Sequence, residues 1–461
     1  MNRRRFLAGS GAVCSGLLAG CFGDDENPES DDKKPGLDGD STELEPEGPT
    51  GPATPPAETP GAAQADATGW TQARQNSRLT GTNRATTGVG SQLALAWETD
   101  LSAGSDEFVS EHVSPVRVTA EGDVYYAAVT RADGSGRGIA LTRVAGGEGT
   151  DDVMYADIGS VLPGTEVRVV DMAVAGNRAV CSFRKNALSV DGGISGELVV
   201  FDLSSGETVY DEDWPGGGPI TVAEDAFYLG TVRMEPRSPE VTTGVAAYGV
   251  APSALRWHTT VAGYSYFAEP RSSVSKRPAV HSGTVYLSGA DGLVGLDTAS
   301  GGPSPFSEHD GFRIVDGQRG VLYVISENDI RGVDLLLGRK TGESFSVDGT
   351  PRGAALSGET LVVTSERGVT ALDVTTGQTQ WSEPAPAGVA SPPSIAGDTL
   401  YYIGDDRVIA RGLSSGERLG ASPLPVADER DTHSLSPQLM VAAGLIVVRA
   451  GNHLYAFESG G

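Results

Sequence analysis

The sequence predicts an all-β fold made of repeated four-stranded sheets. From residue 70 onward, short runs rich in β-branched and aromatic residues alternate with Gly-containing turns. The pattern returns at intervals typical of one propeller blade, and no helical periodicity competes with it over a comparable window. We therefore expect residues 70–461 to form a β-propeller of eight blades. Seven blades stay open as an alternative, because residues 302–350 are irregular.

The clearest repeat is the segment 353–381, GAALSGETLVVTSERGVTALDVTTGQTQW. Its turns fall at residues 357–359, 366–368 and 376–377, and each separates two β-rich runs. The segment therefore predicts four short strands joined by tight hairpins, which is the content of one blade.

Other repeats are found by aligning their first hairpin turn with the turn of this segment. The interval between successive turns runs from 34 residues, Gly283 to Gly317, to 59 residues, Glu224 to Gly283. We interpret the longer intervals as loop insertions into a period of roughly forty residues. The eight turn residues are Gly122, Gly176, Glu224, Gly283, Gly317, Gly358, Gly397 and Gly444.

Residues 371–381, ALDVTTGQTQW, resemble the blade-docking motif of PQQ-like propeller repeats, AxDxxTGxxxW. The matching positions are Asp373, Thr376, Gly377 and Trp381. Partial copies occur at Asp297 with Ser300-Gly301, at Asp202 with Ser205-Gly206 and Tyr210, and, with altered turn residues, at 247–257, ending in Trp257. The resemblance implies that Trp381, Trp257 and Tyr210 dock onto neighbouring blades. The repeat region also resembles BamB-type assembly lipoproteins, which are cofactor-free propellers that bind proteins.

The two ends of the repeat region complement each other. The last repeat stops at its Ser459-Gly460 turn and lacks a fourth strand, whereas the first β-run, residues 93–101, looks like a fourth strand with its own Trp97. We expect residues 93–101 to complete the last blade and close the ring, because closure removes two exposed sheet edges.

The N-terminus resembles an export signal with a lipid anchor. Arg3 and Arg4 begin a pattern similar to a twin-arginine signal, and Leu18-Ala19-Gly20-Cys21 resembles a lipobox. We expect residues 1–20 to be the signal peptide and Cys21 to carry lipid. Residues 21–68 are rich in Pro, Gly, Asp and Glu and predict a disordered linker. The expected location is the outer face of the cytoplasmic membrane.

Acidic residues exceed basic ones by 61 to 34, for a formal net charge of −27. The acids are spread along the chain, which favours adaptation to high salt, where the charges are screened, and suggests a haloarchaeal type of source. An acidic surface without a basic patch also argues against nucleic acid as a partner.

Catalytic motifs are scarce in the sequence. The six His residues form no HxH, HxxxH or HExxH pair, and neither a GxSxG elbow nor a phosphate-binding loop occurs. Of the three Cys residues, Cys14 lies in the leader and Cys21 is the lipid site, which leaves Cys181 in an apolar run as a buried core residue.

The function expected from these observations is binding or scaffolding without catalysis. We expect a membrane-anchored surface propeller that contacts other envelope proteins, with loops 143–166, 184–196 and 231–244 as contact regions, and no cofactor or metal. One alternative is a dehydrogenase of sugars or alcohols that uses PQQ with Ca²⁺. The other is a sensor or carbohydrate-binding propeller, for which the cluster Tyr264, Tyr266 and Phe267 is the candidate surface.

Overall fold

The computed structural model divides into two units, Met1–Ala57 and Glu58–Gly461. The residues that it describes all lie in the second unit, and within them every regular element is a β-strand. The described residues are 82–83, 92–101, 114–131, 137–144, 150–159, 165–187, 193–210, 214–223, 225–234, 241–250, 254–261, 277–289, 292–305, 312–316, 319–326, 329–335, 340–385, 389–425 and 437–459.

Most strands belong to antiparallel sheets of four, and we call four consecutive strands a set. Three such sheets come from consecutive stretches of chain in the second half of the ring. The first contains β15 (Ala279–His281), β16 (Thr284–Gly289), β17 (Gly292–Asp297) and β18 (Pro303–Pro305). The second contains β19 (Phe312–Asp316), β20 (Val321–Ser326), β21 (Asp329–Asp334) and β22 (Lys340–Ser346). The third contains β23 (Pro351–Ser357), β24 (Thr360–Ser365), β25 (Gly368–Asp373) and β26 (Thr379–Pro384).

Two further sheets have the same four-strand core. One contains β3 (Arg117–Val118), β4 (Val124–Arg131), β5 (Arg137–Val144) and β6 (Thr150–Asp157). The other contains β27 (Ser394–Ala396), β28 (Thr399–Gly404), β29 (Arg407–Gly412) and β30 (Arg418–Pro423), and it has a fifth strand, β1 (Thr82–Asn83), beside β27. Three regions that were expected to be loops contain strands instead. Their described residues all lie in strands, apart from 158–159 and 193; the regions are 143–166, 184–196 and 231–244.

The remaining four-stranded sheet closes the ring and confirms the expected pairing of the chain ends. It contains β31 (Gln438–Ala442), β32 (Leu445–Ala450), β33 (His453–Ser459) and β2 (Leu93–Asp100). The strand β2 pairs antiparallel with β33, from Leu93 opposite Ser459 to Asp100 opposite His453. The last set therefore takes its outer strand from the beginning of the repeat region. Because β2 and β33 pair with each other, neither of the two edges where they meet is left open.

Two consecutive sets are fused into one eight-stranded sheet. They are β7 (Thr165–Ala175), β8 (Arg178–Ala187), β9 (Ile194–Asp202) and β10 (Thr208–Tyr210), then β11 (Gly217–Ala223), β12 (Ala226–Met234), β13 (Val241–Gly249) and β14 (Leu255–Thr260). The long ends of β9 and β12 pair, with Met234 opposite Ile194. Beside this pairing, β9 also approaches the residue before β11, and glycine allows the approach because a Cβ on Gly196 would lie 2.0 Å from the carbonyl oxygen of Gly216.

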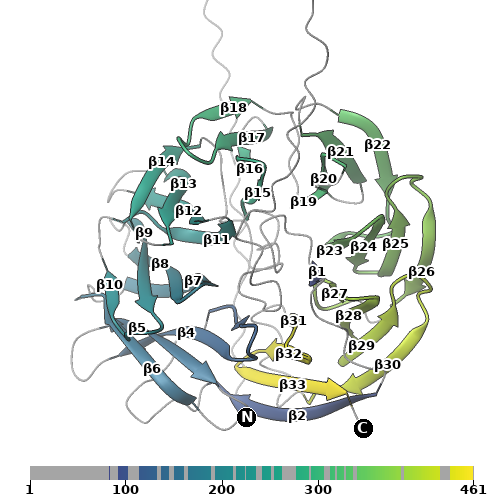
Figure 1. Cartoon of the computed structure of the whole chain (residues 1–461), viewed down its shortest axis with the longest axis horizontal. Helices are drawn as coiled ribbons and strands as arrows, with labels where there is room; N and C mark the ends of the chain where they lie inside the picture. Colours follow the sequence, from purple (N-terminus) through teal and green to yellow (C-terminus); the bar gives the residue numbers. More distant parts are fainter. Residues whose placement is uncertain are drawn as a thin grey trace, which may run out of the picture. The chain divides into compact units, whose positions relative to one another are not determined.

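Figure 1 shows the sets following one another around a common axis, and the first strands that it labels, β7, β11, β15, β19, β23, β27 and β31, are the innermost strands of their sets. We call the eight first strands the inner strands: β3, β7, β11, β15, β19, β23, β27 and β31. The described part of the chain is therefore an all-β β-propeller. Six of its sheets are single blades, and the eight-stranded sheet holds two sets.

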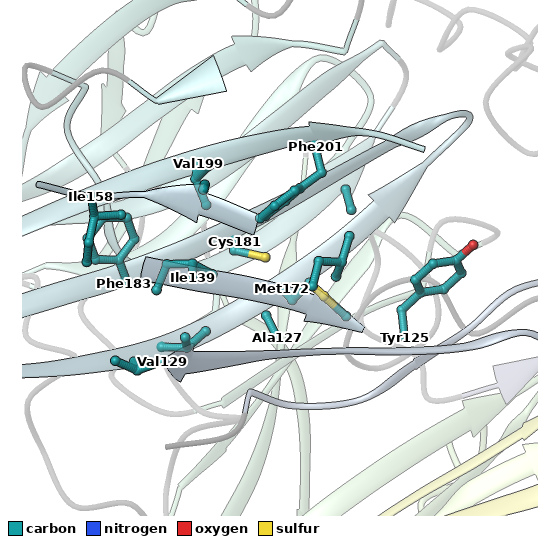
Figure 2. Close-up of a cluster of buried hydrophobic side chains, with 14 of the residues drawn as sticks. Tyr125, Ala127, Val129, Ile139, Ile158, Met172, Cys181, Phe183, Val199 and Phe201 are labelled. Carbon is teal, nitrogen blue, oxygen red and sulfur yellow. The ribbon is translucent and has the colours of Figure 1, made fainter. Parts of the chain in front are cut away.

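The core lies between neighbouring sets. Among the described residues, each hydrophobic cluster is shared by two consecutive sets, and one joins the last set to the first through residues such as Met440 and Tyr126. Figure 2 shows the cluster between β4–β5 and β7–β9, in which Cys181 packs beside Phe183 and Met172. Cys181 is fully buried, as expected of a core residue, and burial raises the pKa of its thiol.

The sequence forms these strands because both faces of each sheet are covered. The strand β24, TLVVTS, is buried at every position after its first, which explains its continuous apolar run. The preceding turn is formed by Gly358 with φ +58°. The other first-turn glycines that the structure describes, Gly122, Gly176, Gly283, Gly397 and Gly444, also have positive φ, whereas Glu224 and Gly317 lie outside the described residues.

Candidate functional site

The most unusual chemistry in the described residues is a buried ion cluster on the inner strands. Arg117 lies on β3, Asp171 on β7, and Arg277 two residues before β15. Their exposed fractions are 2%, 1% and 5%. We call these three residues the inner ion cluster. They come from three different sets. In sequence, Asp171 lies 54 residues after Arg117 and 106 residues before Arg277.

Asp171 is the centre of the cluster, and both of its carboxylate oxygens accept hydrogen bonds. Arg117 Nη2 donates to Oδ1, Arg277 Nη1 donates to Oδ2, and the backbone N–H of Ile220 donates to Oδ2 at 2.7 Å. Arg277 Nη1 also donates to the carbonyl oxygen of Ile220, and Arg117 Nη1 donates to that of Val116 at 2.6 Å. The carboxylate therefore connects four sets, because Ile220 lies on β11.

The ionisation of the cluster follows from competition between burial and neighbouring charge. Burial acts to raise the pKa of Asp171, but Arg277 and Arg117 outweigh it, so that the pKa lies below its usual value. Burial lowers the pKa of Arg117 to about 10, against the attraction of Asp171. Asp171 and Arg117 are therefore charged at neutral pH, and an ionised carboxylate whose two oxygens already accept hydrogen bonds is poorly suited to act as a general base.

Further hydrogen bonds outside the inner ion cluster also connect one set to another. Thr221 Oγ1 donates to Pro278 O at 2.6 Å, and Ser394 Oγ donates to Leu439 O at 3.0 Å. The first and last sets are joined by Arg449, whose Nη1 donates to the carbonyl oxygen of Ser114 at 2.6 Å. The centre of the propeller is thus held by side chains that reach from one set to the next.

The other two buried carboxylates among the described residues are also paired with cations. Glu197 Oε2 lies 2.8 Å from Lys185 Nζ and accepts a hydrogen bond from Tyr210, while Ser195 Oγ donates to Oε1 at 2.6 Å. Asp202 Oδ2 lies 2.7 Å from Arg178 Nη1. The described residues contain no group of three or more His, Cys, Asp or Glu placed to hold a metal ion.

The residues of the docking motif form a local turn. Asp373 Oδ1 accepts hydrogen bonds from the N–H and hydroxyl of Thr375 and from the N–H of Thr376, at 2.9, 2.5 and 2.9 Å. The Thr375 hydroxyl contributes most to lowering the pKa of Asp373 to about 2. Gly377 follows with φ +72°, a conformation that glycine adopts without strain.

Trp381 and Trp257 make the same contact with the next set. Trp381 Nε1 donates to Leu413 O at 2.8 Å, and a Cβ on Gly416 would lie 2.6 Å from its ring. Trp257 Nε1 donates to Thr298 O at 2.8 Å, with Gly301 in the corresponding place at 2.6 Å. Each indole covers the glycine turn of the following set and satisfies one carbonyl there.

Tyr210 lies elsewhere. Its hydroxyl accepts from Lys185 Nζ at 2.9 Å, and its ring lies 6.0 Å from Phe183 in the cluster shared with the preceding set. On the side of the following set, Trp214 packs 5.7 Å from Tyr248. Trp97 on β2 packs against the cluster between the last and first sets.

The sequence motif missed two aromatic contacts between sets. One is Trp214, which lies eight residues after Gly206 instead of four. The other is Phe345 on β22, which lies 3.0 Å from the position a Cβ on Gly377 would take. Thr341-Gly342, three residues before Phe345, is the signal that would have located it.

Several predicted features lie outside the described residues. They are Arg3, Arg4, Cys21 and the aromatic group Tyr264, Tyr266 and Phe267. In the part of the chain that the structure covers, no helix is long and apolar enough to cross a membrane.

The strand pairing defines the class of fold, an all-β β-propeller, and part of the chain is similar to one known family of such repeats. Residues 347–460 match the family model described as outer membrane protein assembly factor BamB. No curated protein matches the sequence.

Solved structures that are similar to the chain include the following two. The crystal structure of BamB from Moraxella catarrhalis is 16% identical and aligns over 79% of this chain and 99% of that one, with a TM-score of 0.48. The crystal structure of the computationally designed Ika8 protein is 13% identical and aligns over 76% and 98%, with a TM-score of 0.36.

Proposed function

We propose that this protein is a non-catalytic propeller that binds other envelope proteins at the cell surface. It is exported through the signal at Arg3 and Arg4 and is anchored by lipid on Cys21 to the outer face of the cytoplasmic membrane, in a salt-loving, haloarchaeal type of cell. It works without a bound cofactor and has no nucleic-acid partner. The eight-stranded sheet counts as two blades, which makes eight in total.

One observation carries the proposal: each described buried carboxylate is paired with a cation of the protein itself. Asp171 is held by Arg117 and Arg277, and Glu197 and Asp202 have their own partners. Catalytic carboxylates need an oxygen available to substrate or metal. These acids instead connect strands and sets, which is the work of a scaffold. The indoles of Trp381, Trp257 and Trp97 serve the same purpose as wedges between blades.

The outer strands offer a surface for protein contact. Five outer strands that follow one another around the ring each carry one exposed, large apolar side chain, with exposed fractions of 39% to 47%. We call these residues the rim set: Leu419 on β30, Leu95 on β2, Val153 on β6, Val209 on β10 and Leu255 on β14. Exposed apolar side chains lose unfavourable contact with water when a partner covers them.

Affinity capture from native membranes at native salt tests the proposal. The unmodified chain should retain a defined set of envelope proteins, and a variant with all five rim residues changed to Ser or Thr should lose at least one of them. A matched control changes five exposed polar residues, Glu207, Thr242, Glu359, Gln380 and Glu417, to Ser. The proposal fails if the rim variant folds and retains the same proteins as the control.

The dehydrogenase alternative has its own readout. Purified protein mixed with PQQ and Ca²⁺ should show neither bound quinone absorbance nor reduction of a dye by sugars or alcohols. Quinone-dependent dye reduction would overturn the non-catalytic function.

A further inference from the structure

The inner strands offer backbone edges on which another strand can be added. Each inner strand lies at the end of its own sheet or set, so one of its edges has no neighbouring strand from the same set. Among the described residues, β27 is the inner strand whose edge is occupied, and its neighbour is β1. Figure 1 shows β1 beside β27, far along the chain from it.

The pairing of β1 with β27 is parallel and short. Thr82 lies opposite Ile395 and Asn83 lies opposite Ala396. Both residues of β1 are buried, with exposed fractions of 3% and 0%. A polar pair enclosed to this degree needs hydrogen-bond partners, because burial removes those that water provides.

The two side chains bind the sets on either side of β27. Thr82 Oγ1 donates to the carbonyl oxygen of Leu356 on β23 at 2.6 Å. Asn83 Nδ2 donates to the carbonyl oxygen of Val441 on β31 at 3.1 Å. Three consecutive sets thus contact one dipeptide. The strand β27 pairs with its backbone, and β23 and β31 accept hydrogen bonds from its side chains.

This arrangement has the elements of peptide recognition by strand addition. Backbone pairing along a sheet edge binds an extended segment of any sequence, and side-chain contacts add specificity. Here the two carbonyls require donors, so a hydroxyl followed by a carboxamide fits, and two apolar side chains of the same size do not. The specificity is set by main-chain atoms at fixed positions in the ring.

We propose that the inner edge of β27, together with the carbonyls of Leu356 and Val441, is a binding site for an extended peptide with Thr or Ser followed by Asn. Thr82–Asn83 is its internal ligand, and an extended segment of a protein partner replaces it. Covalent connection keeps the internal segment at a local concentration of roughly millimolar. A partner strand that pairs along the whole of β27, Ser394–Ala396, displaces the short segment.

This site goes beyond the rim surface of the proposed function, and neither depends on the other. The test uses the full chain with Thr82→Gly and Asn83→Gly, which removes both donors. The probe is a fluorescein-labelled peptide of residues 79–86, LTGTNRAT. The control peptide has the Thr82→Val and Asn83→Leu changes, which keep size and remove the donors.

Fluorescence anisotropy should show saturable binding of the probe to the double-glycine variant, and binding of the control peptide at least tenfold weaker. The unmodified chain should bind the probe at least threefold more weakly than the variant, because its own segment competes. The proposal is overturned if the folded variant binds neither peptide, or binds both equally.

A second measurement covers loss of stability in the variant. If the thermal midpoint falls, 1 mM of the probe peptide should restore it and the control peptide should not, because a ligand of the native state stabilises by mass action. Should the double variant fail to fold, the single change Thr82→Val, which keeps the backbone pairing, replaces it. The single variant should then bind the probe more tightly than the unmodified chain, and equal binding would exclude an exchangeable segment.

Discussion

The inner strands from β3 to β15 are joined by buried charges, unlike the described inner strands from β23 to β31, although both regions also have neutral hydrogen bonds and an indole over a glycine turn. In the first region, Arg117, Asp171 and Arg277 connect the inner strands through buried charges. In the second region, Trp381 covers the Gly416 turn, and the described inner-strand contacts are neutral hydrogen bonds such as Ser394 to Leu439. The two regions have the same strand order and antiparallel pairing.

The difference shows that blade architecture does not depend on one kind of fastening. A buried ion pair carries a large desolvation cost and specifies partners more than it stabilises. An indole over a glycine turn buries apolar area and needs only a local motif to form. The family match at residues 347–460 includes the full copy of this motif, residues 371–381.

Removal of residues 92–101 should have the largest effect, because β2 joins the two regions. Without it, β33 has an open edge and Trp97 leaves the cluster between the last and first sets. We expect loss of the single cooperative thermal transition and concentration-dependent association through the open edge. Calorimetry and light scattering measure both. Deletion of ten residues within 40–49 of the predicted linker controls for chain length, and an unchanged transition after loss of β2 would refute closure.

The Asp171→Asn change should destabilise the first region by about 3–5 kcal/mol, because it leaves two buried guanidinium groups without their counter-charge. Urea unfolding measures the change. The matched control in the second region is Asp348→Asn, which breaks an exposed ion pair with Arg367 and should cost less than about 1 kcal/mol. The triple change Arg117→Met, Asp171→Leu and Arg277→Met should cost less than Asp171→Asn alone. Equal losses for the two Asp variants would remove the contrast between the regions.

The Trp381→Ala change should cost about 2–3 kcal/mol, below the roughly 3–5 kcal/mol of a fully buried aromatic, because the indole is only half-buried. Trp381→Phe should cost about 1 kcal/mol, for the lost bond to Leu413. Gly416→Ala should also destabilise, since its φ is +68° and its Cβ would meet the indole. Gly416→Ala should lower the free energy of unfolding less in a chain that already carries Trp381→Ala than in the unmodified chain, as measured by urea unfolding. If the two changes were fully additive, the indole and Gly416 would not be in direct contact.

Acid should weaken the inner ion cluster by a smaller amount. The pKa of Asp171 is lower in the folded state than in the unfolded state, so its contribution to the free energy of unfolding is complete above the unfolded value of about 3.8. That contribution is lost as pH falls through the folded value. The stability difference between the unmodified chain and Asp171→Asn should therefore narrow below pH 4. Unfolding at pH 7 and at pH 3 measures it, and a constant difference would mean that Asp171 is not the titrating group.

Local features were predicted well from sequence. In the repeat 353–381, the predicted turns separate β23, β24, β25 and β26 as observed. The glycines of the first turns were located because each short turn between two strands needs a residue with positive φ. Glycine adopts this conformation without strain, so its place in the sequence marks the turn. The closing strand was found because the last repeat visibly lacked its fourth strand.

Contacts between sets were predicted poorly. Trp214 and Phe345 were missed because their spacing from the glycine turn differs from that of the motif, while Tyr210 has the motif spacing and packs against the preceding set. The regions 143–166, 184–196 and 231–244 were expected to be loops, but strands extend into them, since paired long strands can carry polar residues at their ends.

The four-strand repeat, the glycine turns and the complementary chain ends follow from the amino-acid sequence alone, because they depend on backbone preferences and apolar patterns within a few consecutive residues. The contacts of Asp171 with Arg117 and Arg277, and of Thr82–Asn83 with β27, are established by the three-dimensional fold. Those contacts join residues 54 to 358 positions apart. Their geometry depends on the register of many strands and on closure of the ring, which no short stretch of sequence encodes.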